Sequence, residues 1–162
     1  VITGGALVIP RGLLHKLIAT SDPGLFGHGD RQAVEYAAMN TVIQIENSLG
    51  YKPKDVSAAK CGYDVESFVP ETVRRLEAYA LRFIEVKGRA KGATTVTVSK
   101  NEILTALNKP EEFILAIVEV DGSDTHTVYL KHPFKNAPDF TATSVNYDIQ
   151  ELIAGSEILY QK

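Results

Sequence analysis

Three residues of the sequence have types and spacing that could do chemistry together, namely Asp64, Glu85 and Lys87. Glu85 and Lys87 are two residues apart in an apolar stretch with the composition of a β-strand. Because side chains alternate between the two faces of a strand, Glu85 and Lys87 should point the same way, and Ile84 and Val86 into the opposite core. Asp64 lies 21 residues before Glu85, in another short strand-like segment. It could therefore supply a second carboxylate beside Glu85.

Two carboxylates with room for water suit Mg²⁺ or Mn²⁺, which prefer oxygen ligands and keep some of their waters. We therefore expect Asp64 and Glu85 to be metal ligands. The metal would lower the pKa of a bound water and neutralise charge on a phosphodiester. Lys87 would orient or deprotonate the attacking water, or stabilise the charged phosphate of the transition state. Purely structural roles are the alternative, since Asp often forms turns and an E-x-K pair on a strand is often solvated.

Further candidates surround this trio. A third acid is expected on the preceding helix, where Glu35 is preferred and Glu46 is its rival. These two are 11 residues apart, almost three helical turns, and so share one helix face. The basic residues Lys60, Arg89 and Lys91 could meet the phosphates of a nucleic acid, although Arg89 and Lys91 could equally form a polar turn.

Two adjacent polar residues, Asn101 and Glu102, open a second predicted helix, and their role stays open at this point. They could line the site, or Asn101 could help to cap the helix.

The elements that must position these residues follow from apolar periodicity and turn signals. The strongest helix is predicted from Asp30, a good N-cap, to Leu49, with Gly50 as the residue after its end. The second helix should start near Ser99 or Lys100. The expected strands are DVSAA (55–59), GYDVESF (62–68), LRFIEVKGR (81–89, ended by Gly88) and TTVTVS (94–99). A fully buried strand, FILAIVEV (113–120), should follow with its hairpin partner, THTVYLKH (125–132). The last expected elements are an extended piece (141–147) and a short helix (148–154). This order predicts an α/β fold with a mixed central sheet flanked by helices.

The string GYDV…RFIEVKG resembles the PD-(D/E)XK superfamily, which includes restriction endonucleases and Holliday-junction resolvases. Over about residues 30–155, the longer pattern resembles an uncharacterised domain at the C-terminal end of large bacterial and archaeal helicase-like proteins, some of them in phage-defence clusters. The same domain occurs in the plant NO VEIN protein.

The resemblance implies a restriction-endonuclease-like sheet and a metal-dependent DNA endonuclease that serves a helicase or translocase region of the same polypeptide. Position by position, Asp64 matches the first acid of the motif, Glu85 the second, Lys87 its lysine, and Glu35 the helix acid. The proline that gives the motif its name is missing before Asp64. Asn101 and Glu102 match an "NE" feature of the uncharacterised domain. The alternatives are an inactive DNA-binding module of the same fold, or a protein-docking domain.

Composition limits these functions only weakly. The chain has 162 residues and a net charge of −3, which argues against a free-standing tight binder of nucleic acid. The single cysteine, Cys61, favours a cytoplasmic location, and no apolar run is long enough to cross a membrane. A linker or extension is expected at 1–29 and the nuclease-like domain at 30–162. The apolar residues Leu13, Leu14 and Leu17 of the extension could support docking or a homodimer.

Overall fold

The computed structural model of the protein describes residues 28–73 and 79–162. Within them lies a six-stranded sheet in the order β1-β2-β3-β5-β6-β8, and β4 and β7 form a separate two-stranded sheet. The strands are β1 (Lys52–Asp55), β2 (Val65–Phe68), β3 (Leu81–Ala90), β4 (Thr95–Ser99), β5 (Phe113–Asp121), β6 (Asp124–Lys131), β7 (Ser144–Asp148) and β8 (Glu157–Gln161). The helices are α2 (His28–Ser48), the 3₁₀ turn η1 (Ser57–Ala59), α3 (Lys100–Asn108) and α4 (Ile149–Gly155).

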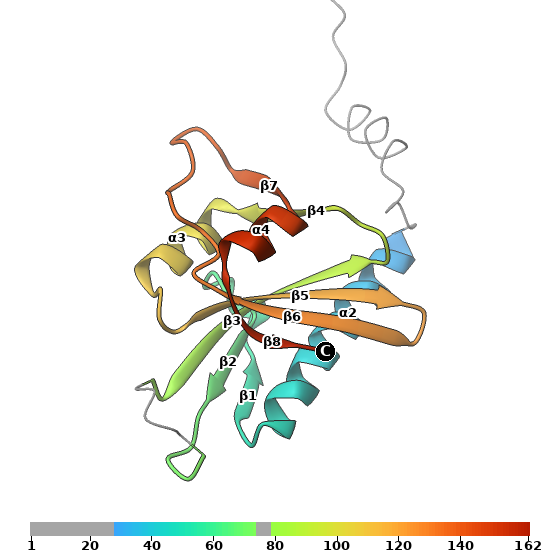
Figure 1. Cartoon of the computed structure of the whole chain (residues 1–162), viewed down its shortest axis with the longest axis vertical. Coiled ribbons are helices and arrows are strands. Elements are labelled where there is room, and N and C mark those ends of the chain that lie inside the picture. The colour runs from blue at the N-terminus through green and yellow to red at the C-terminus, as the bar shows by residue number, and fades with distance from the viewer. Residues whose placement is uncertain (1–27, 74–78) are drawn as a thin grey trace, which may run out of the picture.

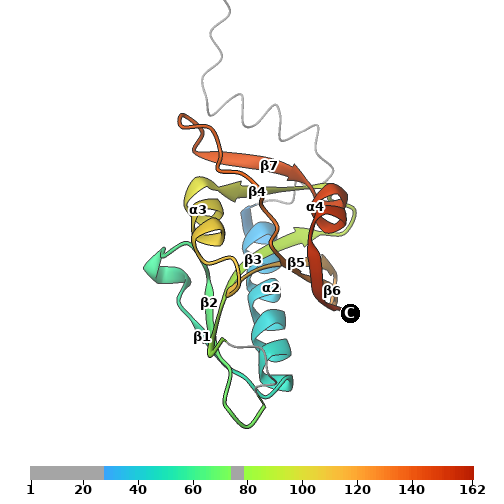
Figure 2. The same ribbon diagram turned by 60° about the vertical axis from the view of Figure 1, so that its left-hand side comes forward.

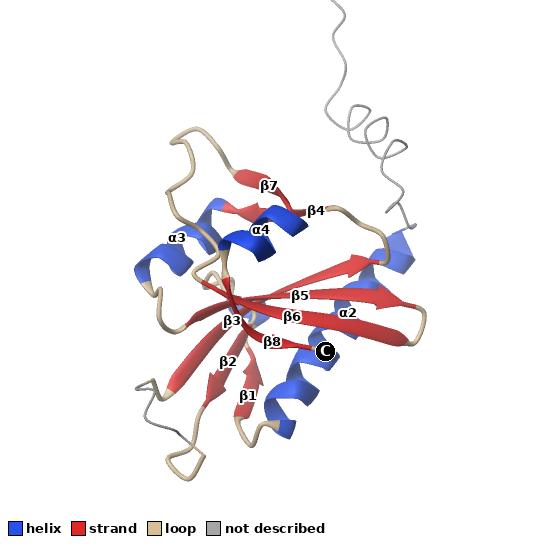
Figure 3. Ribbon diagram, in the orientation of Figure 1, coloured by secondary structure: helices blue, strands red, loops and turns tan. Residues whose placement is uncertain are grey.

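The central sheet is mixed, because β3 and β5 are parallel while their neighbours pair antiparallel. The expected α/β fold with a mixed sheet is therefore confirmed. Helix α2 lies on one side of this sheet, whereas α3, α4 and the β4–β7 pair lie on the other (Figures 1 and 2). Figure 3 shows the same layering by element type. The predicted strand at 94–99 exists as β4, but it belongs to the small sheet.

A separate apolar core fills each side of the sheet. On the α2 side, Ala38 and Val42 pack with Ile84, Ile114 and other strand residues. The other core comprises residues of β4, α3, β5, β6 and α4. Strand β5 contributes alternate residues to both cores, which explains its almost continuous apolar sequence and confirms the predicted strand buried on both faces.

Helix α2 is longer at its start than the sequence indicates. It begins at His28, so Asp30 lies inside the helix and the prediction of Asp30 as N-cap was wrong. Its end agrees with the prediction, because Gly50 has a left-handed φ of 81°. The Tyr51 N–H donates to the Glu46 carbonyl and the Gly50 N–H to the Asn47 carbonyl, each at 3.0 Å, the two bonds of a Schellman motif.

Gly88 does not end its strand, contrary to the prediction, because β3 continues to Ala90. The glycine is there for packing: a Cβ at this position would come within 2.9 Å of both the Val34 carbonyl oxygen and the Ala38 Cβ. Gly88 thus lets α2 lie directly on β3.

Two other predicted elements differ. The segment DVSAA is not a strand, because β1 ends at Asp55 and η1 follows it. The Asp55 Oδ1 accepts from the Ser57 N–H at 2.9 Å and from the Ser57 hydroxyl at 2.7 Å, and this local turn competes with strand pairing. Strand β8, which the sequence reading omits, adds to β6 with an irregularity at Tyr129/Leu130.

The residues before His28, with Leu13, Leu14 and Leu17, lie outside the described part of the chain. Among the described helices, none combines the length and apolar character needed to pass through a bilayer.

Candidate active site

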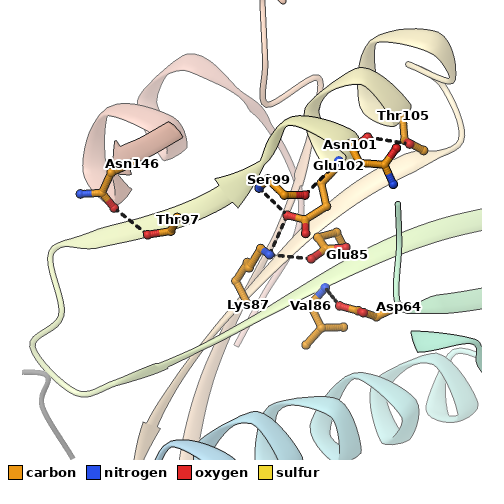
Figure 4. A network of polar contacts seen from close by, with 10 residues as sticks. All are labelled: Asp64, Glu85, Val86, Lys87, Thr97, Ser99, Asn101, Glu102, Thr105 and Asn146. Carbon is orange, nitrogen blue, oxygen red and sulfur yellow. Dashed lines mark hydrogen bonds and ion pairs between the residues drawn. The ribbon is translucent and has the colours of Figure 1, made fainter. Parts of the chain in front are cut away.

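Glu85 and Lys87, two of the three predicted catalytic residues, extend their side chains from β3 on the side that faces α3. Figure 4 shows both side chains directed away from α2, with Val86 directed toward it. The Lys87 Nζ lies 2.6 Å from the Glu85 Oε1. Ile84 and Val86 belong to the core beneath α2, so the predicted alternation of side chains is confirmed. Glu85 lies in the buried part of the strand, being only 3% exposed.

Asp64 lies one residue before β2 rather than within it, and β3 holds it by two hydrogen bonds. The Asp64 N–H donates to the Ile84 carbonyl at 2.9 Å, and the Asp64 Oδ2 accepts from the Val86 N–H at 3.0 Å. These bonds fix the carboxylate beside the backbone that carries Glu85. Asp64 and Glu85 consequently line one cavity of about 320 Å³.

Helix α3 supplies the opposite wall of this cavity. Ser99 is the N-cap, and its hydroxyl accepts from the Glu102 N–H while the Glu102 carboxylate accepts from the Ser99 N–H. This capping box places Glu102 over β3, where its Oε2 lies 2.7 Å from the Lys87 Nζ. Asn101 lines the cavity and is not the cap. The residues lining the cavity are Ser57, Lys60, Gly62, Tyr63, Asp64, Glu85, Ser99, Asn101 and Glu102.

The loop that leads to Asp64 packs closely on α3. Gly62 has φ of 94°, and a Cβ there would come within 2.2 Å of the Thr105 hydroxyl and 3.2 Å of the Asn101 side-chain nitrogen. Only glycine combines this backbone angle with this close approach. Gly62 therefore helps to hold Asp64 and Asn101 at the same cavity.

Burial sets the electrostatics of the two metal-ligand candidates. It raises the pKa of Glu85 to about 8, with Lys87 opposing the rise and Asp64 adding to it. Burial also raises the pKa of Asp64, although the hydrogen bond from the Val86 N–H and the charge of Lys87 oppose it. Both carboxyl groups therefore hold their protons more tightly than free side chains, which is typical of sites that use a cation or a proton.

Lys87 and Glu102 stabilise one another's charged forms. Burial disfavours the Lys87 ammonium, but the charge of Glu85 and the hydrogen bonds to Glu102 and Glu85 outweigh it and raise the lysine pKa. For Glu102, burial favours a higher pKa. The contact with Lys87 outweighs burial, so the pKa of Glu102 is lowered. Lys87 thus lies between the carboxyl groups of Glu85 and Glu102.

The helix acids do not join this group. Glu35 is exposed on α2, and Glu46 is fully buried beneath the opposite face of the sheet, 3.5 Å from Arg82. Burial raises the pKa of Glu46, with Arg82 opposing the rise. The helix period placed both acids on α2 correctly, but it could not show that α2 packs on the face away from Glu85 and Lys87.

The three basic candidates, Lys60, Arg89 and Lys91, do not all lie at the cavity either. Lys60 lines the cavity and has a left-handed φ of 51°. Arg89 lies on β3 and is partly buried, whereas Lys91 is exposed and pairs with Asp121 at 2.7 Å. The structure therefore brings only Lys60 of these three to the lining of the cavity.

The carboxylate oxygens of the cavity suit a hard divalent cation. Asp64 and Glu85 present carboxylate oxygens to one open cavity, and Mg²⁺ is commonly held by one or two carboxylates with water completing its shell. In the described part of the chain, no group of three or more His, Cys, Asp and Glu side chains has the arrangement of a metal site. A cation here would therefore depend on two protein carboxylates and solvent.

The sequence reading left the role of Glu102 open and did not single out Ser57, Gly62 and Tyr63 as lining residues. A signal for Glu102 was present, since Ser99-Lys100-Asn101-Glu102 has the S-x-x-E pattern of a capping box. The contact with Lys87 had no such signal, because it depends on how α3 crosses β3.

The fold and the cavity define a class: an α/β protein whose mixed sheet carries a buried carboxylate–lysine group covered by a capped helix. A family model described as Protein NO VEIN, C-terminal, matches residues 34–130, more than half of the chain. The chain belongs to this family, as the sequence pattern predicted. No curated protein and no solved structure matched the chain.

Proposed function

We propose that this domain is a metal-dependent phosphodiesterase that hydrolyses DNA, of the PD-(D/E)XK kind. One observation carries the proposal: Asp64 and Glu85 line the same cavity, and Lys87, which does not itself line it, contacts Glu85 at 2.6 Å. This combination of residues matches the chemistry that phosphodiester hydrolysis needs, namely oxygen ligands for a cation and a positive charge for the phosphate.

The residues divide the work as follows. Asp64 and Glu85 would hold Mg²⁺ or Mn²⁺, which when bound activates water and neutralises phosphate charge. Lys87, which contacts the lining residues Glu85 and Glu102 without itself lining the cavity, would supply positive charge beside the phosphate. Lys60, exposed on the lining, offers a second cation to the nucleic-acid backbone.

The wider setting is proposed from the resemblance alone. The domain would act within a cytoplasmic helicase-type polypeptide, and the helicase or translocase region would deliver DNA to the cavity. A homodimer is compatible with such a setting, and the oligomeric state can be measured by light scattering.

The test is a cleavage assay on plasmid and single-stranded DNA with Mg²⁺ or Mn²⁺. Asp64→Asn and Lys87→Met should each lower the cleavage rate by about 10²-fold or more, because each removes charge from the reacting centre. Lys52→Met is the matched control, since Lys52 is an exposed residue of β1 that does not line the cavity.

Cleavage that persists in both Asp64→Asn and Lys87→Met would refute the proposal. If the wild-type domain does not cleave DNA, its binding of Mn²⁺ is measured by calorimetry. Heat of binding that disappears in Asp64→Asn would support the metal site, whereas no binding at millimolar Mn²⁺ would favour an inactive DNA-binding or docking module.

A further inference from the structure

The loop between β6 and β7 (132–143) carries the most exposed large apolar side chain of the described residues. The phenyl ring of Phe140 belongs to a residue that is 90% exposed. The loop runs beside α3 (Figures 1 and 2), the helix whose first turn forms one wall of the cavity. Because an apolar ring gains free energy when another surface covers it, this position suits a contact with a molecule that enters the cavity.

The backbone at Phe140 is held on both sides. The Phe140 carbonyl oxygen accepts from the Lys100 Nζ at 2.7 Å, and the Lys100 N–H donates to the Thr143 carbonyl at 2.9 Å. Within the loop, the Asp139 Oδ1 accepts from the Thr141 N–H at 2.9 Å and from the Thr141 hydroxyl at 2.7 Å. The ring is therefore presented from a turn that is already ordered, which lowers the entropy lost on binding.

Lys100 places this ring beside the candidate active site. It is the first residue of α3 and stands between Ser99 and Asn101, which both line the cavity. The Lys100 Nζ lies 4.9 Å from the centroid of the Phe140 ring. A flat aromatic face and a positive charge thus occur together next to the cavity, and these match the base and the phosphate of a nucleotide.

An unpaired nucleobase fits this surface better than a protein partner does. Protein interfaces bury contiguous surface with several large side chains at their centre. In the described chain, none of the other exposed large apolar residues belongs to this loop, to α3 or to β4. A single ring is enough to stack one base, and stacking tolerates every base because each has an aromatic face.

We propose that Phe140, with Lys100 beside it, is a stacking platform for an unpaired base of single-stranded DNA. The inference rests on the proposed function and deepens it, since it names the class of substrate: a DNA strand whose bases next to the cleaved phosphodiester are free. In a closed duplex each base is stacked between its neighbours, so no face is available to the ring.

The first measurement is the fluorescence of Phe140→Trp, because the chain contains no tryptophan and the introduced indole is then its only one. An oligothymidine of about ten nucleotides, added with EDTA so that no metal-dependent cleavage occurs, should quench this fluorescence by stacking. Tyr36→Trp is the matched control, since Tyr36 is 71% exposed but lies on α2, on the other side of the sheet. Its fluorescence should not change. Relaxed closed circular duplex DNA should quench neither variant.

The second measurement is the affinity of Phe140→Ala and Tyr36→Ala for the same labelled oligothymidine, by fluorescence anisotropy in EDTA. Loss of one stacked base should weaken binding by Phe140→Ala between about 5-fold and 100-fold, whereas Tyr36→Ala should bind like the wild type. A base-free deoxyribose phosphate polymer of equal length separates stacking from charge, because wild type and Phe140→Ala should bind it equally. Circular dichroism checks that each variant is folded.

The possible results separate this inference from the proposed function. Wild-type affinity for oligothymidine in folded Phe140→Ala, or no binding by the wild type, overturns the inference whether or not the domain cleaves DNA. Equal quenching by the closed duplex, or equal weakening toward the base-free polymer, overturns it too. Binding that depends on Phe140 in a domain that cleaves no DNA with Mn²⁺ would contradict the nuclease proposal and support the stacking platform.

Discussion

At the scale of single residues, Glu85 is a carboxyl group that is almost entirely removed from water. Its side chain is buried against the sheet with Lys87 as an ion-pair partner, and burial raises its pKa to about 8. The pKa in the unfolded chain is near 4.5. Because the folded state binds the proton more tightly, this group stabilises the fold most at low pH, and that stability is lost as pH rises from about 4.5 to about 8.

The free energy of unfolding should therefore depend on pH in a way that Glu85→Gln removes. Between pH 5 and pH 9 the wild-type protein should lose stability relative to the variant by on the order of 3 kcal/mol, at about 1.4 kcal/mol per pKa unit with some relaxation. Urea unfolding at pH 5, 7 and 9 measures this difference. A stability difference that is constant over this range would show that Glu85 titrates like an exposed side chain.

The residues of the site were only partly predictable. Alternation along a strand was enough to place Glu85 and Lys87 on one face, since it depends only on local geometry. The helix acid was not predictable, because Glu35 and Glu46 have the right period but the packing face of α2 is set by contacts such as that of Gly88 with Val34. Long-range packing of this kind leaves little trace in a single sequence.

At the scale of elements, the contact between α2 and β3 depends on the missing side chain of Gly88. A Cβ at that position would overlap the Val34 carbonyl oxygen and the Ala38 Cβ, both at 2.9 Å, so the helix would have to move. We expect Gly88→Ala to destabilise the protein by about 1–3 kcal/mol, as other overpacked cores do.

Thermal unfolding of Gly88→Ala beside Gly155→Ala measures this effect. Gly155 is the last residue of α4, and a Cβ there meets nothing within 4 Å, so the control should be within about 0.5 kcal/mol of wild type or slightly more stable. Equal melting temperatures for the two variants would mean that α2 does not press on β3.

The helices and strands agree with the predictions wherever one strong local signal dominates the sequence. The buried run of β5 and the start of α3 were predicted within a residue or so, although the cap is Ser99 and not Asn101. Errors arose where two signals competed. In DVSAA the Asp55 side chain bonds to Ser57 and replaces strand pairing, and in β8 an exposed, short edge strand carries little apolar periodicity.

At the scale of the whole molecule, the central sheet separates two apolar cores that share only the strands between them. Ile84 is fully buried on the α2 side, and Ile103 of α3 is fully buried on the other. Substitutions in different cores do not alter the same side-chain packing. Their effects on the free energy of unfolding should therefore be independent, although the sheet unfolds as one unit.

Ile84→Val and Ile103→Val test this arrangement. Each should lower the free energy of unfolding by about 0.5–1.5 kcal/mol, and the double variant should equal the sum within about 0.5 kcal/mol. Urea denaturation followed by fluorescence and by circular dichroism gives the values. Two separate transitions would show that the sheet does not join the two cores into one cooperative unit, whereas a coupling well above that limit would show that the two cores are not independent.

The placement of the cavity along the chain has a consequence for how the protein folds. All residues that line the cavity lie between Ser57 and Glu102. Two contacts within the carboxylate–lysine group, the Lys87–Glu102 ion pair and the hydrogen bond from Val86 to Asp64, close loops of 15 and 22 residues. Closing such short loops costs little chain entropy, and neither contact involves β6, β7, α4 or β8, which follow later in the chain. The carboxylate–lysine group can thus assemble early in folding, before the C-terminal edge of the sheet is complete.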